Sequence, residues 1–414
     1  MLARARQHSG GLYLFIATSA ANVLGFGYQI VMARLLRPEE FAVLTALFGI
    51  LILESISSQV IQSATAKLAA QYRARDEEAA LHAFVRRWAV RVGGGAAAVG
   101  LLVALLSGVL AGALALPALS VALLGLTLFL ALSFTFGLGL LQGLARFVWM
   151  GTALIAQAGA RLAVGVVLVL VGLGVDGAFT GATAAIALSL VVVAVPLLPL
   201  FRAARGSRVT HELGPAETRF FALSAVVLLA YAALTNIDAV LARSLLRPED
   251  AGAYAGAITM GKIVLFAPIA IGFLLLERTA RTHALGEDTD HALFLALAFV
   301  LATSGLVALA YILVPDFLVP LVVGSQYPET AKIVGTYGVA ALANALLNLW
   351  ISYFIGRGEM RVGLLLALAV VAELVLLLTS ATDPLAMARI VLVVALATQA
   401  AAVATFTVRK ARAG

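Results

Sequence analysis

Five ionisable residues lie inside long apolar runs of the sequence, where we expect lipid rather than water. They are Glu54, Arg161, Asp238, Lys262 and Glu373. An ionisable group at bilayer depth costs about 2.5 to 3.5 kcal/mol on insertion scales, so such groups are functional candidates by default. Counted at about 1.5 Å per helical residue, four of them fall near the midplane and Asp238 falls in the outer third. The two basic residues are candidates for holding an anion.

The three acids admit more than one interpretation. A carboxyl group in low dielectric shifts towards its protonated form, so Glu54, Asp238 and Glu373 are candidates for loading and unloading H⁺ or Na⁺ as the conformation changes. Alternatively the charges stabilise packing, with Arg161 paired to Glu54 and Lys262 paired to Asp238. For Glu373 a third interpretation is a buried carboxyl that stays neutral. The sequence leaves these alternatives open.

Uncharged polar residues on the apolar runs form a second candidate set. Gln157 lies four residues before Arg161, and Asn344 lies four residues before Asn348, so the members of each pair share a helix face. Sugar hydroxyls would use such donors and acceptors, and so would hydrogen bonds between helices. The candidates for substrate contact in this set are Asn22, Gln29, Gln157, Asn344 and Asn348.

The elements that must position these side chains are membrane helices. Hydrophobic residues make up 63% of the 414 and charged residues only 12%, with a mean hydropathy of +1.06. Soluble domains are roughly half apolar and one-quarter charged. Runs of about 20 apolar residues recur, each long enough to cross the hydrocarbon core as a helix. The sequence has no cysteine and five scattered histidines, so we expect no disulfide, no metal site and no cofactor.

Twelve helices are predicted from these runs and from the charges, prolines and glycines that bound them. They start near residues 10, 40, 79, 118, 147, 177, 217, 250, 290, 329, 360 and 385. With the N-terminus inside, 20 of the 28 Lys and Arg residues fall on the cytoplasmic side, 6 on the other side and 2 in mid-helix. We therefore expect a multi-pass protein of the cytoplasmic (cell) membrane with both termini in the cytoplasm. The net charge of +7 is then a topology signal, and no nucleic-acid binding is expected.

An internal repeat divides the predicted helices into two sets of six. The turn Leu35–Glu40 (LLRPEE) recurs as Leu245–Asp250 (LLRPED), 210 residues later in a chain of 414. At the same offset an acidic pair at residues 77 and 78 meets one at 287 and 288. Because six is even, both sets begin on the same side of the membrane and the repeats are parallel. We predict an N-lobe (residues 1–209) and a C-lobe (residues 210–414) that enclose a central cavity, an arrangement typical of transport.

Short motifs near these turns indicate a family. Ala33–Phe41 (ARLLRPEEF) is similar to an ARxLGPxxFG turn, and Leu246–Tyr254 (LRPEDAGAY), after Asp238, is similar to a D…LxxxLGPxxxGxY segment. Val323–Tyr327 (VGSQY) resembles an FGxxY element. Together these segments resemble polysaccharide (O-antigen, Wzx-like) flippases of the multidrug/oligosaccharidyl-lipid/polysaccharide (MOP) exporter superfamily. The chain departs from that pattern by having arginine at positions 37 and 247, where the family usually has glycine.

The resemblance implies a flippase that moves a lipid-linked oligosaccharide, of the undecaprenyl-diphosphate type, from the cytoplasmic to the outer leaflet by alternating access. Arg161 and Lys262 would then hold the diphosphate, whose charges a dry cavity would leave unpaired. H⁺ or Na⁺ would be the coupling ion, and we expect a monomer without enzyme activity. One alternative is a drug/cation antiporter of the same superfamily, which would favour an acid-lined cavity. The other is a polytopic glycan polymerase or ligase, for which the predicted outer loops are too short.

Glycines on the third predicted helix are expected to serve packing. The run Gly93–Gly95 and the later Gly100 lie in apolar sequence and are not followed by Lys-Ser/Thr, so they do not fit a phosphate-binding loop. Small residues let membrane helices approach closely. We therefore predict that a neighbouring helix packs against these glycines.

Overall fold

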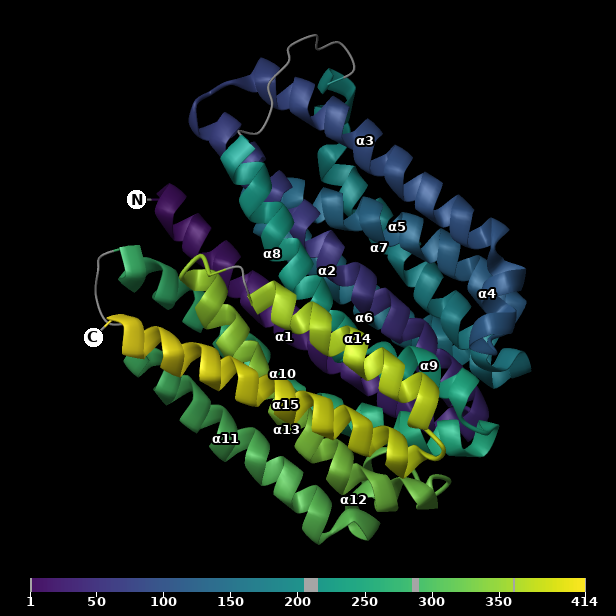
Figure 1. The fold of residues 1–414 in the computed structure, drawn as a ribbon. Helices are drawn as coiled ribbons and strands as arrows, with labels where there is room; N and C mark the ends of the chain where they lie inside the picture. The colour runs from purple at the N-terminus through teal and green to yellow at the C-terminus, as the bar shows by residue number, and fades with distance from the viewer. Residues whose placement is uncertain (1, 205–214, 285–289, 360–361, 414) are drawn as a thin grey trace. The chain divides into compact units, whose positions relative to one another are not determined.

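The computed structural model of the chain describes residues 2–204, 215–284, 290–359 and 362–413. All regular secondary structure in these ranges is helical (Figure 1). The described residues contain ten segments long and apolar enough, by length and composition, to cross a membrane. The longest of them, Phe147–Ala204, has 58 residues and contains two of the predicted helices. The predicted all-helical membrane fold is confirmed.

The chain forms two compact units. The first unit consists of Met1–Leu36 and Glu54–Phe221, and the second unit consists of Arg37–Leu53 and Ala222–Gly414. Helix α2 (Pro38–Ala74) therefore contributes its first part to the second unit and its remainder to the first. The lobe boundary that the repeat places at residue 209 stays a prediction.

Five long helices and two short segments complete the first unit. Helix α6 packs against α1 and α7, and α5 packs against α3 and α7. Gly172, with φ of 92°, lies between α6 and α7 in a backbone conformation that glycine adopts at little cost. The elements are α1 (Leu2–Leu35), α3 (Glu78–Leu105), α4 (Ser107–Leu114), α5 (Ala118–Gly143), α6 (Phe147–Leu168), the π-helical turn η1 (Val169–Leu173) and α7 (Gly174–Ala204).

The second unit is organised around one central helix, α13. This helix packs against α10, α11 and α15, while α14 packs against α15 and α9. Its buried aromatic residues Trp350, Tyr353 and Phe354 form a core with Phe406 of α15. The elements are α8 (Pro215–Leu234), which belongs to this unit from Ala222 onward, α9 (Ile237–Leu245), α10 (Pro248–Ala284), α11 (Asp290–Leu313), α12 (Pro315–Val322), the 3₁₀ turn η2 (Pro328–Thr330), α13 (Ala331–Gly356), α14 (Val362–Ser380) and α15 (Pro384–Ala413).

The internal repeat is preserved in the order and packing of these helices. Helices α2 and α10 both have 37 residues and begin at Pro38 and Pro248, so the offset of 210 holds for the whole element. The packing series α3–α5–α7 recurs as α11–α13–α15, and the pair α1–α6 recurs as α9–α14. Two short helices, α4 and α12, occupy equivalent places in the two series and were not predicted. The repeat therefore includes the order and packing of several helices in each half of the chain, and not only the LRPE turn.

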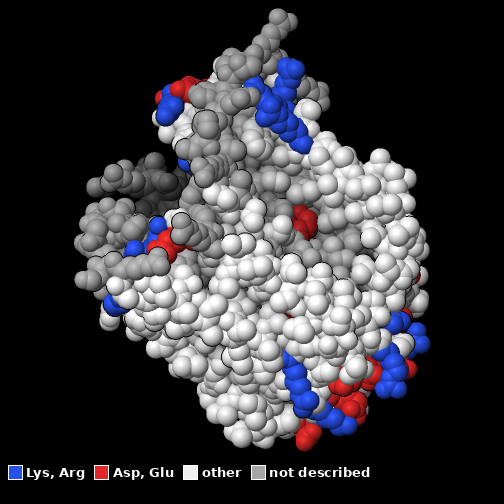
Figure 2. Space-filling model, viewed as in Figure 1, with Lys and Arg blue, Asp and Glu red and all other residues white. Residues whose placement is uncertain are grey.

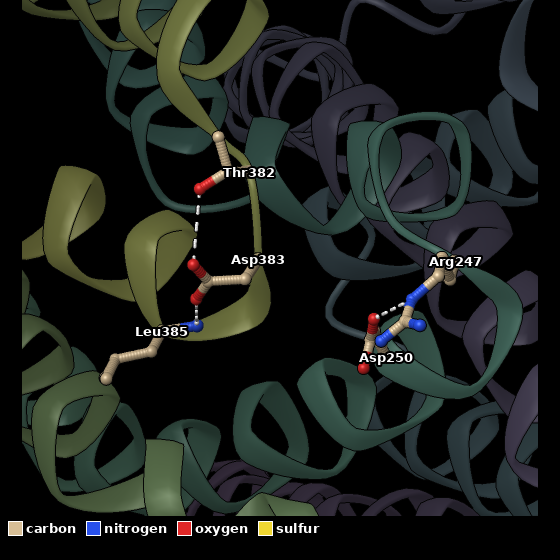
Figure 3. Close-up of polar contacts among 5 residues, drawn as sticks. All are labelled: Arg247, Asp250, Thr382, Asp383 and Leu385. Atoms are coloured by element: carbon tan, nitrogen blue, oxygen red, sulfur yellow. Dashed lines mark hydrogen bonds and ion pairs between the residues drawn. The ribbon is translucent and has the colours of Figure 1, made fainter.

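The repeated LRPE turns carry out the same local task twice. Proline begins α2 and α10, and acidic residues occupy the first turn of each helix, at its positive end. The side chain of Arg37 pairs with Glu40, with 3.5 Å between Nε and Oε2, and Arg247 donates from Nε to Asp250 Oδ2 at 2.8 Å (Figure 3). Both arginines are largely exposed, so each pair contributes little to stability. Arg37 and Arg247, which depart from the family pattern, thus each pair with an acidic residue in the first turn of the helix that follows.

Helices of both units leave large apolar side chains on the surface. On α3 Leu101, Leu102 and Leu105 are exposed, and on α12 Phe317 is exposed. Much of the face drawn in Figure 2 is uncharged. Exposed apolar surface of this extent fits a protein whose solvent is lipid.

The glycines of α3 differ from one another in what they face. A Cβ added at Gly100 would lie 2.5 Å from the carbonyl oxygen of Gly125 on α5, so the two helices touch there. By contrast, no described atom of a neighbour lies within 4 Å of a Cβ added at Gly93, Gly94 or Gly95. The packing prediction is confirmed for Gly100 and is wrong for the run of three, which faces away from the described helices.

A break between α8 and α9 replaces the single helix predicted from residue 217. At the break Asn236 leaves the helical conformation (φ −143°), and its side-chain amide donates to the carbonyl of Ala232 at 3.0 Å. The hydroxyl of Thr235 donates to the carbonyl of Tyr231 at 3.0 Å. Thr and Asn side chains compete with the backbone in this way and interrupt helices. As a result Asp238 lies in the first turn of a new helix, α9.

Asp383 caps the start of α15. Its Oδ1 accepts hydrogen bonds from the backbone N–H groups of Leu385 and Ala386, both at 2.9 Å. Thr382 donates to its Oδ2 at 3.2 Å, and Figure 3 shows this bond and the one from Leu385. The N–H of Ala386 is the main cause that lowers the pKa of Asp383 from its ordinary value of 3.8. A carboxylate at this position also suits the positive end of the helix.

Replacing this cap is expected to destabilise the second unit. Asp383→Ala leaves two N–H groups without their acceptor and should lower stability by about 1 kcal/mol. Because the folded state depresses the pKa, the carboxylate stabilises the fold above pH 3.8, and that stabilisation is lost as the pH falls through the folded pKa. Thermal unfolding in detergent at neutral and acidic pH measures both effects. An Asp383→Ala protein with the wild-type Tm at neutral pH would contradict the capping role.

Candidate functional site

In the first unit Arg161 lies against an aromatic ring. This residue is half-buried on α6, and its Cζ lies 5.0 Å from the ring centroid of Tyr28 on α1. The Tyr28 ring is fully buried, and its hydroxyl donates to the carbonyl of Ala178 on α7 at 2.9 Å. A cation over the face of an aromatic ring is attracted by the ring quadrupole. The guanidinium therefore rests on a ring that is fixed at both ends.

Two glycines make room for this pair. A Cβ added at Gly25 on α1 would lie 2.7 Å from Nη2 of Arg161, and a Cβ added at Gly165 on α6 would lie 2.8 Å from Cε2 of Tyr28. A larger residue at either position would displace the guanidinium or the ring. Neither glycine and no tyrosine was predicted to belong to a site. One signal was present, because Gly165 follows Arg161 by four residues and so shares its helix face.

Three of the predicted polar candidates lie on the same two helices. Gln157, half-buried on α6, is one turn from Arg161. On α1, Asn22 is exposed and Gln29 is half-buried, and they lie three residues before and four residues after Gly25. Helical spacing places both on the face of α1 that carries this glycine. The first unit thus brings one cation and three amides to the α1–α6 contact.

Glu54 on α2 has a hydroxyl partner. It is half-buried and accepts a hydrogen bond from Ser58, one turn further along the helix. The structure places its predicted partner, Arg161, against the ring of Tyr28. Glu54 remains a candidate for coupling or pairing.

The second unit brings Asp238 and Glu373 together. Asp238 on α9 and Glu373 on α14 are each 1% exposed, and they interact electrostatically. Two phenol groups donate to the same oxygen of Asp238: Tyr254 on α10 and Tyr337 on α13 each lie 2.9 Å from Oδ2. The two rings meet edge to face, with centroids 5.5 Å apart. We call Asp238, Glu373, Tyr254 and Tyr337 the acid cluster.

Lys262 belongs to the surroundings of the acid cluster. It is half-buried on α10, two turns after Tyr254, and interacts electrostatically with Asp238. This is the neighbour that the pairing interpretation expects. The preceding residue, Gly261, lies against Tyr337, because a Cβ there would be 2.5 Å from the ring atom Cε1. This stretch of α10 therefore contributes a cation and fixes one of the two phenols.

The two asparagines of α13 contact α8. The hydroxyl of Tyr231 donates to the backbone carbonyl of Asn344 at 2.9 Å, and the Asn348 side chain hydrogen-bonds to the same tyrosine. Asn344 is buried and Asn348 is half-buried. These contacts favour packing for Asn348, whereas Oδ1 of Asn344 has no hydrogen-bond partner among the described residues. Asn344 lies two turns after Tyr337 on α13, so these two polar residues share one face of that helix.

Comparison with known proteins places the fold but gives no sequence family. No protein-family model matches the chain, and no curated protein matches it. A multidrug resistance MATE family transporter of the MOP superfamily, in an inward-facing conformation, superposes with a TM-score of 0.75 at 11% identity, covering 96% of each chain. The lipid II flippase MurJ superposes with a TM-score of 0.67 at 12% identity, covering 96% of this chain and 87% of its own.

A eukaryotic MATE transporter, AtDTX14, gives a TM-score of 0.63 at 14% identity, covering 98% of this chain and 96% of its own. All three likenesses extend over nearly the whole chain and none depends on close sequence similarity. The chain therefore has the fold of the MOP-superfamily transporters, a helical bundle of two lobes. This fold is common to drug transporters and to a lipid flippase.

Proposed function

We propose that the protein is a membrane transporter that moves a lipid-linked oligosaccharide, carried on undecaprenyl diphosphate, from the cytoplasmic to the outer leaflet by alternating access. Arg161 carries this proposal. Its guanidinium lies over the Tyr28 ring, and a guanidinium can donate two parallel N–H bonds to two oxygens of an anion such as a phosphate group. The lipid II flippase MurJ is among the proteins with this fold.

The proposal assigns the remaining residues around Arg161 to the glycan end of the substrate. Amide side chains can donate to and accept from sugar hydroxyls. By helix spacing, Asn22 and Gln29 share the face of α1 that carries Gly25, and Gln157 shares the face of α6 that carries Arg161. Residues 1–209 and 210–414 would act as the N-lobe and C-lobe of a monomer in the cell membrane, with both termini in the cytoplasm. On this proposal Asn344 is a substrate contact of the C-lobe, whereas Asn348 hydrogen-bonds to Tyr231 and Lys262 lies beside Asp238.

Coupling to an ion gradient is assigned to the acid cluster. Two buried carboxyl groups side by side cannot both carry a negative charge at low cost, so one of them gains from binding a cation. Asp238 and Glu373 are such a pair, and both are nearly inaccessible. H⁺ and Na⁺ are the candidate ions.

A drug/cation antiporter is the second candidate function. It is favoured by the same buried acids and by the MATE transporters among the structures with this fold. An antiporter of organic cations has no need of a buried guanidinium, however, because like charges repel. The position of Arg161 therefore favours an anionic substrate.

Binding to the purified protein distinguishes the two candidates. We expect a labelled undecaprenyl-diphosphate oligosaccharide to bind saturably and to be displaced by undecaprenyl diphosphate but not by undecaprenol, because Arg161 recognises the diphosphate. The cationic dye ethidium should not bind saturably. Saturable ethidium binding that other organic cations displace, with no binding of the lipid, would replace the flippase by the antiporter.

A further inference from the structure

We infer that the two acids of the cluster have different charge states and that Glu373, not Asp238, exchanges a proton. Asp238 stays ionised, and the chain's own Lys262 serves as its counter-cation. The coupling ion is then H⁺ rather than Na⁺. This inference deepens the proposed transport function, on which its role in coupling rests.

Asp238 is surrounded by groups that favour a negative charge. Its Oδ2 accepts hydrogen bonds from the phenols of Tyr254 and Tyr337, and a carboxylate gains more from such donors than a neutral carboxyl does. It lies in the first turn of α9, where the unpaired N–H groups create positive potential. Lys262 adds a full positive charge in electrostatic contact. Burial opposes the charge of Asp238, and these three features favour it.

Among the residues that the structure describes, none gives Glu373 these features. It is 1% exposed in the middle of α14, and its Oε1 has no hydrogen-bond partner among the described residues. Its electrostatic contacts are Asp238 on α9, which is negative, and two phenols, Tyr254 on α10 and Tyr337 on α13, which already donate to Asp238. A second negative charge beside Asp238, away from water, is unfavourable. Glu373 is therefore the protonated member of the pair.

The described side chains of the helix on the other side of Glu373 supply no counter-charge. Helix α15 packs against α14, and its described ionisable residues are Arg389 and Lys410. Arg389 is exposed and interacts with Asp383, while Lys410 donates to Asp290 at 3.2 Å. Arg389 and Lys410 therefore each have an acidic neighbour other than Glu373.

Lys262 also explains why sodium would bind poorly at this cluster. A tethered ammonium acts at a high effective concentration, so a free Na⁺ would have to displace a cation that cannot diffuse away. Moreover, both phenols donate to Oδ2 of Asp238, so a metal ion would have only Oδ1 of this carboxylate free of hydrogen bonds from described residues. A proton needs only one oxygen of Glu373. The step is an O–H bond formed with a proton from water on one side of the membrane and broken on the other.

Infrared difference spectroscopy of the purified protein in lipid tests this assignment without any substrate. The carbonyl stretch of a buried protonated carboxyl should be present in the wild type and disappear as the pH is raised. Glu373→Gln should lack this band, and it should fold because the amide imitates a neutral carboxyl. Asp238→Asn should keep it. Glu54→Gln, which removes a membrane carboxyl from the first unit, is the matched control and should also keep it.

Sodium provides the second part of the test. Exchanging potassium for sodium should leave the wild-type titration unchanged, whereas Lys262→Met should make it sodium-sensitive because the tethered cation is gone. The inference is overturned by a band that survives in Glu373→Gln, by a wild-type titration that sodium shifts, or by a Lys262→Met protein that ignores sodium. A protein that fails to flip lipid but shows these spectra would refute the proposed substrate and leave the proton assignment intact.

Discussion

Arg161→Gln is expected to lower the rate of lipid flipping at low substrate concentration by about 10- to 100-fold. The reason is the loss of charge-assisted hydrogen bonds to the diphosphate, each worth about 1.5 to 3 kcal/mol, where every 1.4 kcal/mol corresponds to about a factor of ten. The initial rate is measured in vesicles that contain equal amounts of folded protein. Arg161→Lys should give an intermediate rate, because it keeps the charge and loses the planar fork.

Tyr28→Phe is the matched control for this variant. It keeps the ring beneath the guanidinium and removes only the hydroxyl that donates to Ala178. We expect a loss of stability of about 1 kcal/mol, typical of one hydrogen bond, with little change in flipping. If folded Arg161→Gln protein flips lipid as fast as the wild type, Arg161 is a packing residue and the diphosphate is held elsewhere.

The second large effect is expected for Gly100→Ala, which should destabilise the first unit by about 1 to 3 kcal/mol, the usual cost of overpacking. The added Cβ would lie 2.5 Å from the carbonyl oxygen of Gly125, closer than real Cβ contacts come. The contact is reciprocal, since a Cβ on Gly125 would lie 2.3 Å from the oxygen of Gly100. Both atoms that must yield are backbone, so α3 and α5 would have to separate.

Gly94→Ala provides the comparison, because it makes the same change on the same helix where the Cβ meets no described neighbour within 4 Å. There the better helix propensity of alanine should stabilise by up to about 1 kcal/mol. Thermal unfolding of both variants in detergent measures the difference. Equal Tm changes would show that α3 and α5 do not touch at Gly100.

The order of the helices could be predicted from the sequence because its signals are local. Apolar runs give the long helices, and Pro38 and Pro248 begin α2 and α10 at the same offset in each half. Helices α4 and α12, of 8 residues each, were missed because so short an apolar run shows no membrane-spanning length. The break at Asn236 was missed because its cause is a side chain that bonds to its own helix.

The ionisable candidates could be found in the sequence, whereas their neighbours could not. A charge within an apolar run is visible by itself, which is how Arg161, Asp238 and Glu373 were identified. A tyrosine is common in such runs, so nothing singled out Tyr28 or Tyr337 as a partner. Which side chains meet depends on how distant helices pack. The same limit applies to the glycines of α3, since the sequence does not say which face of that helix meets a neighbour.

The most direct test of the proposed function follows the lipid across a bilayer. Vesicles reconstituted with the protein carry a fluorescent undecaprenyl-diphosphate oligosaccharide in both leaflets, and a membrane-impermeant reductant is added outside. We predict that the reductant quenches inner-leaflet lipid as well, at a rate that rises with the amount of protein and falls in Arg161→Gln. Quenching that stops at the outer leaflet, as in protein-free vesicles, while a cationic dye moves against a gradient in the same preparation, would contradict the proposal.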